Sequence, residues 1–192
     1  MAIRHIPWLS PDEYLDREAV SETKHMYFAG AVTAMAGGSV AHWTICGNLI
    51  AAIHAGLRGR GCRVGGSDVL FRTGSGEMFT YPDVAVICGA VETVPGRKHV
   101  VTNPVFVAEV CSPSTESKDR GSKLREYRAS PALRQFILVS QDEPWVEVHT
   151  RDETGKWHVD DVTGLDAVCV LTGIDCAVPM AAIYEGALEV EG

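Results

Sequence analysis

The amino-acid sequence predicts a domain of the α/β or α+β class, in which a central mixed β-sheet is flanked by helices. Segments of helix and strand type follow the order helix, hairpin, helix, three strands, helix and further strands, which is typical of this class. The 192 residues, of which 46% are hydrophobic, are enough to build one sizeable core. No linker or internal repeat divides the sequence. We therefore expect a single domain over residues 1–192.

Two helices and a hairpin are predicted before residue 58. Ser-Pro-Asp-Glu at residues 10–13 combines an N-cap, a first-turn proline and two acids, which opens a helix expected to continue to about residue 21. Residues 26–35 are of β type and are interrupted by Ala-Gly at 29–30, which indicates a hairpin. After Gly-Gly-Ser at 37–39, apolar residues recur every four positions and predict a helix that faces the core: Ile45, Leu49, Ile53 and Leu57.

The middle of the chain is of strand type. Residues 62–72, 79–88 and 105–111 are rich in β-branched and aromatic residues and predict three strands. A glycine-rich turn at 74–76 and a polar stretch at 89–103 separate them. Residues 105–111 alternate poorly between apolar and polar, which predicts a strand buried on both faces.

The second half begins with a turn, Ser-Pro-Ser-Thr at 112–115. It leads into a predicted helix at 117–129, which Ser-Pro at 130–131 ends. The remaining strand-type segments are one buried strand and the two arms of a hairpin that turns at Glu-Thr-Gly: residues 135–141, 145–150 and 157–159.

Composition and charge exclude several classes of protein. No stretch approaches the roughly 18 apolar residues of a membrane helix, and the N-terminal residues lack a signal-like apolar region. We therefore expect a soluble, cytoplasmic protein with no membrane partner. The net charge of −8 disfavours broad nucleic-acid affinity. Two basic clusters oppose this charge, and either surface charge or phosphate binding explains them: Arg58, Arg60, Arg63 and Arg72, and Lys118, Arg120, Lys123, Arg125, Arg128 and Arg134.

The cysteines and the common catalytic motifs add little support for other sites. The six cysteines form no CxxC pair and mostly lie in apolar segments, which favours reduced core thiols over zinc ligands or disulfides. No GxSxG, GxGxxG or P-loop motif is present. His42 follows a helix-capping turn, where an ordinary histidine is favoured over a phosphate-binding one. The four tryptophans are too scattered to predict a base-stacking surface.

An acid within an apolar strand is the most informative chemical feature. Glu109 lies in the run Val-Phe-Val-Ala-Glu-Val, where burial of an unpaired carboxylate is costly. Asp83 opens the preceding strand, so the two acids approach each other if these strands are neighbours. Two carboxylates suit Mg²⁺ or Mn²⁺, and an ammonium from Lys123 would orient water or stabilise a leaving oxyanion. These residues predict a metal site for phosphodiester cleavage.

Each of these three residues also has a purely structural explanation. Pro-Asp before a strand is common turn chemistry, so Asp83 alone is weak support. Glu109 would be satisfied by a plain ion pair with an arginine. Lys123 lies on a charged helix where an exposed lysine is ordinary, and it gains weight from the two acids.

Three sequence blocks stand out together: Tyr-Pro-Asp-Val-Ala-Val at 81–86, Val-Ala-Glu-Val-Cys-Ser-Pro-Ser-Thr at 107–115, and Asp119-x3-Lys123-x3-Tyr127. In order and spacing they resemble the Uma-two family of the PD-(D/E)XK restriction-endonuclease-like superfamily. The resemblance covers most of the chain, because it extends to Lys24-His25, to residues 34–39 with His42 and Asn48, and to Ser67-Asp68.

The resemblance implies a restriction-endonuclease-like core and Mg²⁺-dependent cleavage of DNA. It also implies that Asp83 and Glu109 are metal ligands and that Lys123 is the catalytic lysine. The usual lysine of the superfamily falls two residues after the acid, where this chain has Cys111. A long, flexible ammonium from a neighbouring helix reaches the same point.

Two departures from the family leave a second function open. Family members usually carry a glutamate directly after Lys-His and another after the hairpin glycine, where this chain has Met26 and Ala31. The chain is then either a metal-dependent deoxyribonuclease or a catalytically impaired relative that acts as a DNA-binding or protein-interaction module. A homodimer is expected, because cleavage of a duplex requires two cuts and a two-fold assembly supplies two sites.

Overall fold

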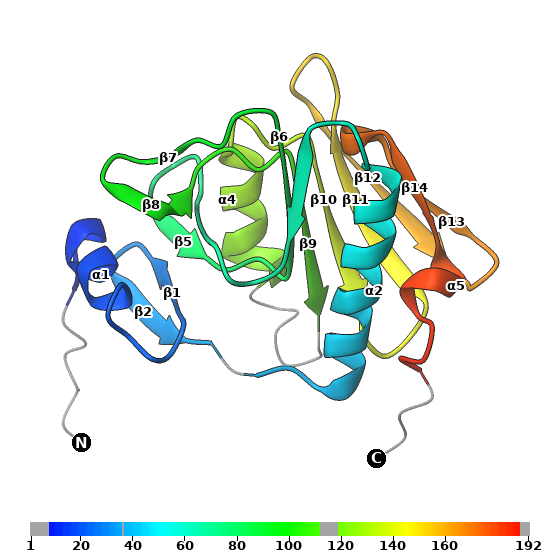
Figure 1. Cartoon of the computed structure of the whole chain (residues 1–192), viewed down its shortest axis with the longest axis horizontal. Helices are drawn as coiled ribbons and strands as arrows, with labels where there is room; N and C mark the ends of the chain where they lie inside the picture. The colour runs from blue at the N-terminus through cyan, green and yellow to red at the C-terminus, as the bar shows by residue number, and fades with distance from the viewer. Residues whose placement is uncertain (1–7, 36, 112–118, 189–192) are drawn as a thin grey trace.

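Two six-stranded mixed sheets form the framework of the chain (Figure 1). The structure is a computed structural model that describes residues 8–35, 37–111 and 119–188, with the backbone alone at 119 and 120. The strands of the first sheet are β1 (His25–Phe28), β2 (Ala31–Ala34), β4 (Leu70–Arg72), β5 (Met78–Thr80), β7 (Thr93–Val94) and β8 (Arg97–Val101). Their order is β2-β1-β5-β4-β8-β7, and β4 and β8 run parallel.

The second sheet carries the predicted acid-containing strand at its centre. Its strands are β3 (Cys62–Gly65), β6 (Val84–Cys88), β9 (Phe106–Cys111), β10 (Gln135–Ser140), β11 (Trp145–Arg151) and β12 (Trp157–Thr163). Their order is β12-β11-β10-β9-β6-β3, with β9 and β10 parallel and β6 and β9 antiparallel. The predicted mixed α/β architecture is confirmed, with two large sheets in place of one.

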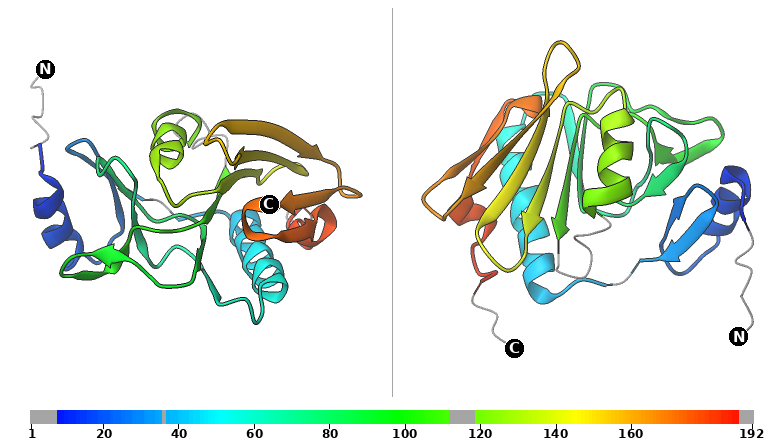
Figure 2. Two further views of the ribbon diagram at one scale, coloured as in Figure 1. Left: turned by 90° about the horizontal axis from the view of Figure 1, so that it is seen from above. Right: turned by 180° about the vertical axis from the view of Figure 1, so that it is seen from behind.

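Helices lie on both faces of the second sheet. The long helix α2 (Val40–Gly56) covers one face and α4 (Leu124–Ala129) covers the other, as Figure 2 shows from above and from behind. The hairpin of β13 (Val168–Leu171) and β14 (Cys176–Pro179), joined by the 3-10 helix η2 (Thr172–Ile174), lies on the α2 side with α5 (Met180–Ile183). Helix α1 (Pro11–Glu18) packs against β1 of the first sheet.

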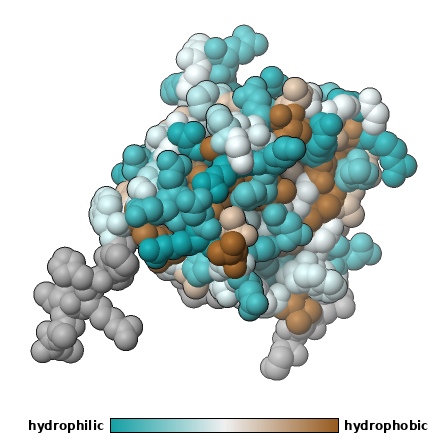
Figure 3. Space-filling view, turned by 60° about the vertical axis from the view of Figure 1, so that its left-hand side comes forward, coloured by the Kyte–Doolittle hydropathy of each residue, from teal (hydrophilic) through white to brown (hydrophobic). Residues whose placement is uncertain are grey.

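The described helices and the face drawn in Figure 3 show how apolar side chains are distributed. No helix in the described ranges is long and apolar enough to cross a membrane. The face drawn in Figure 3 consists mainly of hydrophilic side chains, with apolar ones in small, separate spots. The buried apolar side chains form three clusters in the interior.

The side chains of β9 alternate between two cores. Phe106 and Val110 belong to the core shared with α2. Val107 belongs to the core on the opposite face, together with Tyr127 of α4. The predicted burial of this strand on both faces is confirmed. Because side chains alternate along a strand, Glu109 points to the α4 side.

The first two helices follow their sequence signals closely. In α2, the residues at four-residue spacing are fully buried, including Ile45, Leu49 and Ile53. Helix α1 begins with the expected N-cap at Ser10, which also forms a capping box with Glu13. It ends at Glu18, not near residue 21.

Two of the predicted strands are each divided between the two sheets. Residues 62–72 form β3 of the second sheet and β4 of the first. Residues 79–88 form β5 and β6, which are separated at Tyr81, Pro82 and Asp83. Proline donates no hydrogen bond to a sheet ladder, so the chain crosses from one sheet to the other at this point. Asp83 therefore lies at the crossing, directly before β6.

The remaining elements differ from the prediction in smaller ways. The polar stretch at 89–103, expected to be a loop, contains β7 and β8. The described part of the predicted helix at 117–129 consists of a π-helix, η1 (Asp119–Lys123), followed by α4. Residues 117 and 118, and the turn predicted at 112–115, lie outside the described residues. The three strands predicted in the second half are confirmed as β10, β11 and β12.

Cys62 and Cys88 form a disulfide. They are register partners in the antiparallel pair of β3 and β6, with their Cα atoms 4.0 Å apart. The prediction that all six cysteines are reduced thiols is wrong for this pair, because the register that joins them is not visible in their sequence spacing. The other four cysteines are outside any disulfide: Cys46, Cys111, Cys169 and Cys176.

Reduction of this disulfide is expected to lower the free energy of unfolding by about 2–4 kcal/mol. The bond joins residues 26 positions apart, and its loss gives the unfolded chain more conformational freedom. Urea unfolding of the oxidised and the reduced protein measures the difference. The double variant Cys62→Ser/Cys88→Ser should unfold like the reduced protein and should not respond to reductant. Equal midpoints for the oxidised and reduced protein would contradict the prediction.

Candidate functional site

Glu109 is the buried acid at the centre of the site. The residue is 4% exposed and lies in the middle of the second sheet. The Nζ of Lys123 lies 3.1 Å from its Oε1, and the hydroxyl of Tyr127 donates a hydrogen bond to the same oxygen. These two donors compensate a carboxylate that would otherwise be costly to bury. The ion pair of Glu109 is therefore formed with the predicted lysine, Lys123, and not with an arginine.

Lys123 and Tyr127 reach Glu109 from adjoining helical segments. Lys123 ends the π-helix η1, and Tyr127 lies one turn later in α4. Side chains four residues apart lie on the same face of a helix, so both point to β9. Lys123 is 9% exposed, and its interpretation as an ordinary exposed lysine is therefore wrong. Single π-helical turns occur frequently at functional sites.

Asp83 is anchored to the strand that carries Glu109. Its Oδ2 accepts a hydrogen bond from the backbone N–H of Val110 at 2.8 Å and lies 3.2 Å from Nε2 of His42. Both of these contacts, which are formed with described residues, involve the same carboxylate oxygen of Asp83. The register pairs Val84 with Ala108. Continued by one residue, it places Asp83 level with Glu109, at the start of β6.

Helix α2 places two further side chains that can ligate a metal, those of His42 and Cys46, near Asp83. The Oγ of Ser39 caps the helix by accepting a hydrogen bond from the N–H of His42. One turn later, the Sγ of Cys46 lies 3.6 Å from Nδ1 of His42. Burial raises the pKa of the Cys46 thiol well above its usual range, and the charges of Asp83 and Glu109 raise it further.

A pocket of about 1070 Å³ opens beside these residues. Its wall includes the start of α2, with His42, Trp43 and Cys46, and also Asp83. Trp43 is 75% exposed. Lys24, the residue directly before β1 of the first sheet, also lines the pocket, with its Nζ 2.7 Å from Oδ1 of Asp68. Small ions and polar ligands therefore have an open route to Asp83 from solvent.

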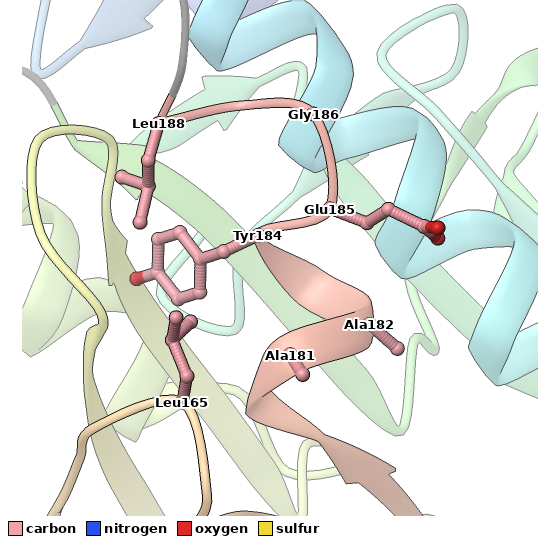
Figure 4. A pocket seen from close by; sticks show the side chains of 7 residues that line it. All are labelled: Leu165, Ala181, Ala182, Tyr184, Glu185, Gly186 and Leu188. Atoms are coloured by element: carbon pink, nitrogen blue, oxygen red, sulfur yellow. The ribbon is translucent and has the colours of Figure 1, made fainter.

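A second pocket, of about 410 Å³, lies on the α5 side of the molecule (Figure 4). Its lining includes Leu165, Tyr184 and Leu188, whose side chains are grouped together, while Glu185 points away from them. The hydroxyl of Tyr184 donates to backbone oxygens of the chain. None of the predicted site residues line this pocket, and its apolar wall with one carboxylate offers no catalytic set.

Two members of the first basic cluster, Arg60 and Arg63, make structural contacts. Arg60 pairs with Asp175 at 2.8 Å, and Arg63 donates to the backbone oxygen of Gly89. In the second cluster, Arg128 lies 3.1 Å from Nδ1 of His149, while Lys118 falls outside the described residues. These contacts favour the structural interpretation of Arg60, Arg63 and Arg128.

The two positions where the family usually has glutamate lie on the first hairpin. Met26 is in β1 and packs against the core below α4. Ala31 is in β2 and is exposed. Neither side chain offers an oxygen ligand for Mg²⁺ or Mn²⁺. Glu22 lines the large pocket and is exposed.

The structure brings together more of the site than the sequence indicates. It places Lys123 against Glu109 and ties Asp83 to the residue that follows Glu109, while their roles remain predictions. Sequence reasoning missed Tyr127 as a partner of Glu109, although the Lys123-x3-Tyr127 spacing is a signal of it. It also assigned His42 to an ordinary helix start, because a contact with Asp83, 41 residues away, leaves no local pattern.

Comparisons with known proteins identify the family of the chain. The family model Uma2, described as "Putative restriction endonuclease", matches residues 11–177. Two proteins of Synechocystis sp. are similar to the chain. The uncharacterized protein slr1290 is 35% identical over 94% of this chain and 93% of its own length. The uncharacterized protein sll1609 is 29% identical over 83% of this chain and 90% of its own length.

One solved structure has the same fold. It is described as a putative nuclease belonging to DUF820 from Anabaena variabilis, and it aligns with a TM-score of 0.74 over 92% of this chain and 97% of its own. The two sequences are 16% identical, so this likeness supports the nuclease-like fold alone. With the family match over most of its length, the chain belongs to the Uma2 family of restriction-endonuclease-like proteins.

Proposed function

We propose that this protein is a metal-dependent deoxyribonuclease that hydrolyses DNA phosphodiester bonds at Asp83 and Glu109. The observation that carries the proposal is the buried carboxylate of Glu109 with an ammonium and a phenol at one of its oxygens. A second carboxylate, Asp83, is held beside the same strand. A structural ion pair needs no second acid, whereas a metal site for phosphoryl chemistry does.

The donor set fits Mg²⁺ or Mn²⁺, because both ions prefer oxygen ligands. Asp83 and Glu109 would hold the ion, which would supply an activated water and neutralise charge on the phosphate. The backbone N–H of Val110 fixes the orientation of Asp83. Lys123 would orient the attacking water or stabilise the leaving oxyanion, and Tyr127 would hold Glu109 in place.

The test is a calorimetric titration of Mn²⁺ into the wild-type protein and into Asp83→Asn. We expect binding in the wild type and none in the variant, because the substitution removes a charged ligand. The amide oxygen still accepts the hydrogen bond from Val110, so the fold should be preserved, which circular dichroism checks. Asp175→Asn is the matched control: Asp175 is exposed and has a φ of 50°, which asparagine tolerates.

The two outcomes separate the two functions left open by the sequence. Binding that is lost in Asp83→Asn and kept in Asp175→Asn supports the nuclease. Absence of binding in the wild type would favour a catalytically impaired module, for which the lack of ligands at Met26 and Ala31 is the supporting feature. Unchanged affinity in Asp83→Asn would remove Asp83 from the site.

A homodimer in the cytoplasm completes the proposal. A two-fold pair would place two sites on one duplex, one for each strand. Sedimentation with and without a DNA duplex would test this, and a monomer in both conditions would contradict it.

A further inference from the structure

We propose that His42, Cys46 and Asp83 form a second, overlapping binding site for a borderline-soft divalent ion of the Zn²⁺ type. One ligand atom from each of these three residues lies within 4.8 Å of the other two. The set contains nitrogen, sulfur and oxygen, which are the donors that Zn²⁺ takes in proteins. Mg²⁺ avoids thiolate, so this set differs chemically from the pair of carboxylates.

The three side chains come from two parts of the fold, helix α2 and the residue before β6. His42 and Cys46 lie four residues apart, on one face of the 17-residue helix α2. Asp83 precedes β6 and is oriented by the N–H of Val110. Nε2 of His42 lies 3.2 Å from Oδ2 of Asp83, and Nδ1 of the same ring lies 3.6 Å from Sγ of Cys46. One of the two ring nitrogens would ligate the ion, together with the thiolate and the carboxylate.

Access and local packing are consistent with an ion at this point. All three residues are partly buried and line the pocket of about 1070 Å³. A water or a substrate atom would complete a tetrahedral shell from the open side. A Cβ added at Gly38 would lie 2.6 Å from Nδ1 of His42. The imidazole of His42 can therefore keep its present position only with glycine at residue 38.

This assignment changes the interpretation of Cys46. The sequence pattern favours core thiols that bind no zinc, whereas the structure places this thiol beside a histidine and a carboxylate. If the proposed nuclease function holds, the two metal sites share Asp83. Zn²⁺ would then compete with Mg²⁺ and inhibit cleavage.

The test uses Co²⁺ as a spectroscopic substitute for Zn²⁺ on the purified full-length chain. The experiment is run without thiol reductant, which would bind the ion and open the Cys62–Cys88 disulfide. We expect a thiolate-to-cobalt charge-transfer band in the near ultraviolet, which Zn²⁺ removes by displacement. The nearly isosteric variant Cys46→Ser should lose the band.

Two further variants make the test specific. Cys176→Ser is the matched control, because Cys176 is also a partly buried thiol outside the disulfide and should leave the band unchanged. Gly38→Ala alters no ligand but displaces the imidazole, so it should weaken Co²⁺ binding. Circular dichroism confirms that each variant is folded.

The result that overturns the proposal is equally defined. A wild-type protein without the band, a band that persists in Cys46→Ser, or a band lost in Cys176→Ser would each reject this site. Mn²⁺ calorimetry on the wild type tests the nuclease site separately. A cobalt band without Mn²⁺ binding would reject the nuclease and support the site at His42, Cys46 and Asp83. Mn²⁺ binding without the band would support the nuclease and reject that site.

Discussion

The variant Lys123→Met is expected to reduce metal-dependent DNA cleavage by about 10²–10³-fold, the usual loss when one oxyanion-stabilising group is removed. Methionine fills a similar volume but carries no charge. The position is buried, and its ammonium lies 3.1 Å from Glu109. Nicking of plasmid DNA in the presence of Mn²⁺ measures the rate.

Two comparison variants define what the loss means. Lys98→Met changes an exposed lysine of β8 in the other sheet and should cleave at the wild-type rate. Lys123→Arg keeps a cation near Glu109 but replaces the compact ammonium by a planar guanidinium. Compared with Lys123→Met, it should restore more of the free energy of unfolding than of the cleavage rate. Wild-type cleavage by Lys123→Met would exclude Lys123 from the chemistry.

The sequence predicts a site residue where a charged side chain stands in an apolar segment. Glu109 is evident because a carboxylate in an apolar strand requires compensation, and the structure provides it in Lys123 and Tyr127. His42 and Cys46 do not stand out in this way, because each is an ordinary residue for a helix. Their contact with Asp83 depends on how α2 packs on the second sheet, which is a tertiary property.

The fold shows the same division between local and long-range information. The four-residue spacing in α2 and the apolar run of β9 predict buried elements, and both are confirmed. Hydrophobic content does not reveal that residues 62–72 and 79–88 each contribute to two sheets. Pro82 marks one crossing, but a proline also fits an edge strand. The Cys62–Cys88 pair likewise depends on register, which is set across strands.

The double variant Glu109→Gln/Lys123→Met is expected to be more stable than either single variant and to be inactive. Each single substitution leaves one buried charge without its partner, which costs about 3–5 kcal/mol. The double variant removes both charges, and glutamine still offers an oxygen to the hydroxyl of Tyr127. Urea unfolding measures stability, and Mn²⁺-dependent nicking measures activity. A double variant destabilised by the sum of the two single effects would contradict this expectation.

This comparison separates stability from function because the two explanations of the ion pair predict different patterns. A buried ion pair is often replaceable by uncharged residues of similar volume at little cost in stability. If the pair served only the fold, its uncharged replacement would keep all the properties of the protein. Stability that returns while metal binding and cleavage stay absent would mean that Glu109 and Lys123 are charged for the chemistry at Asp83. The same protein would then show why an acid is tolerated at the centre of a fully buried strand.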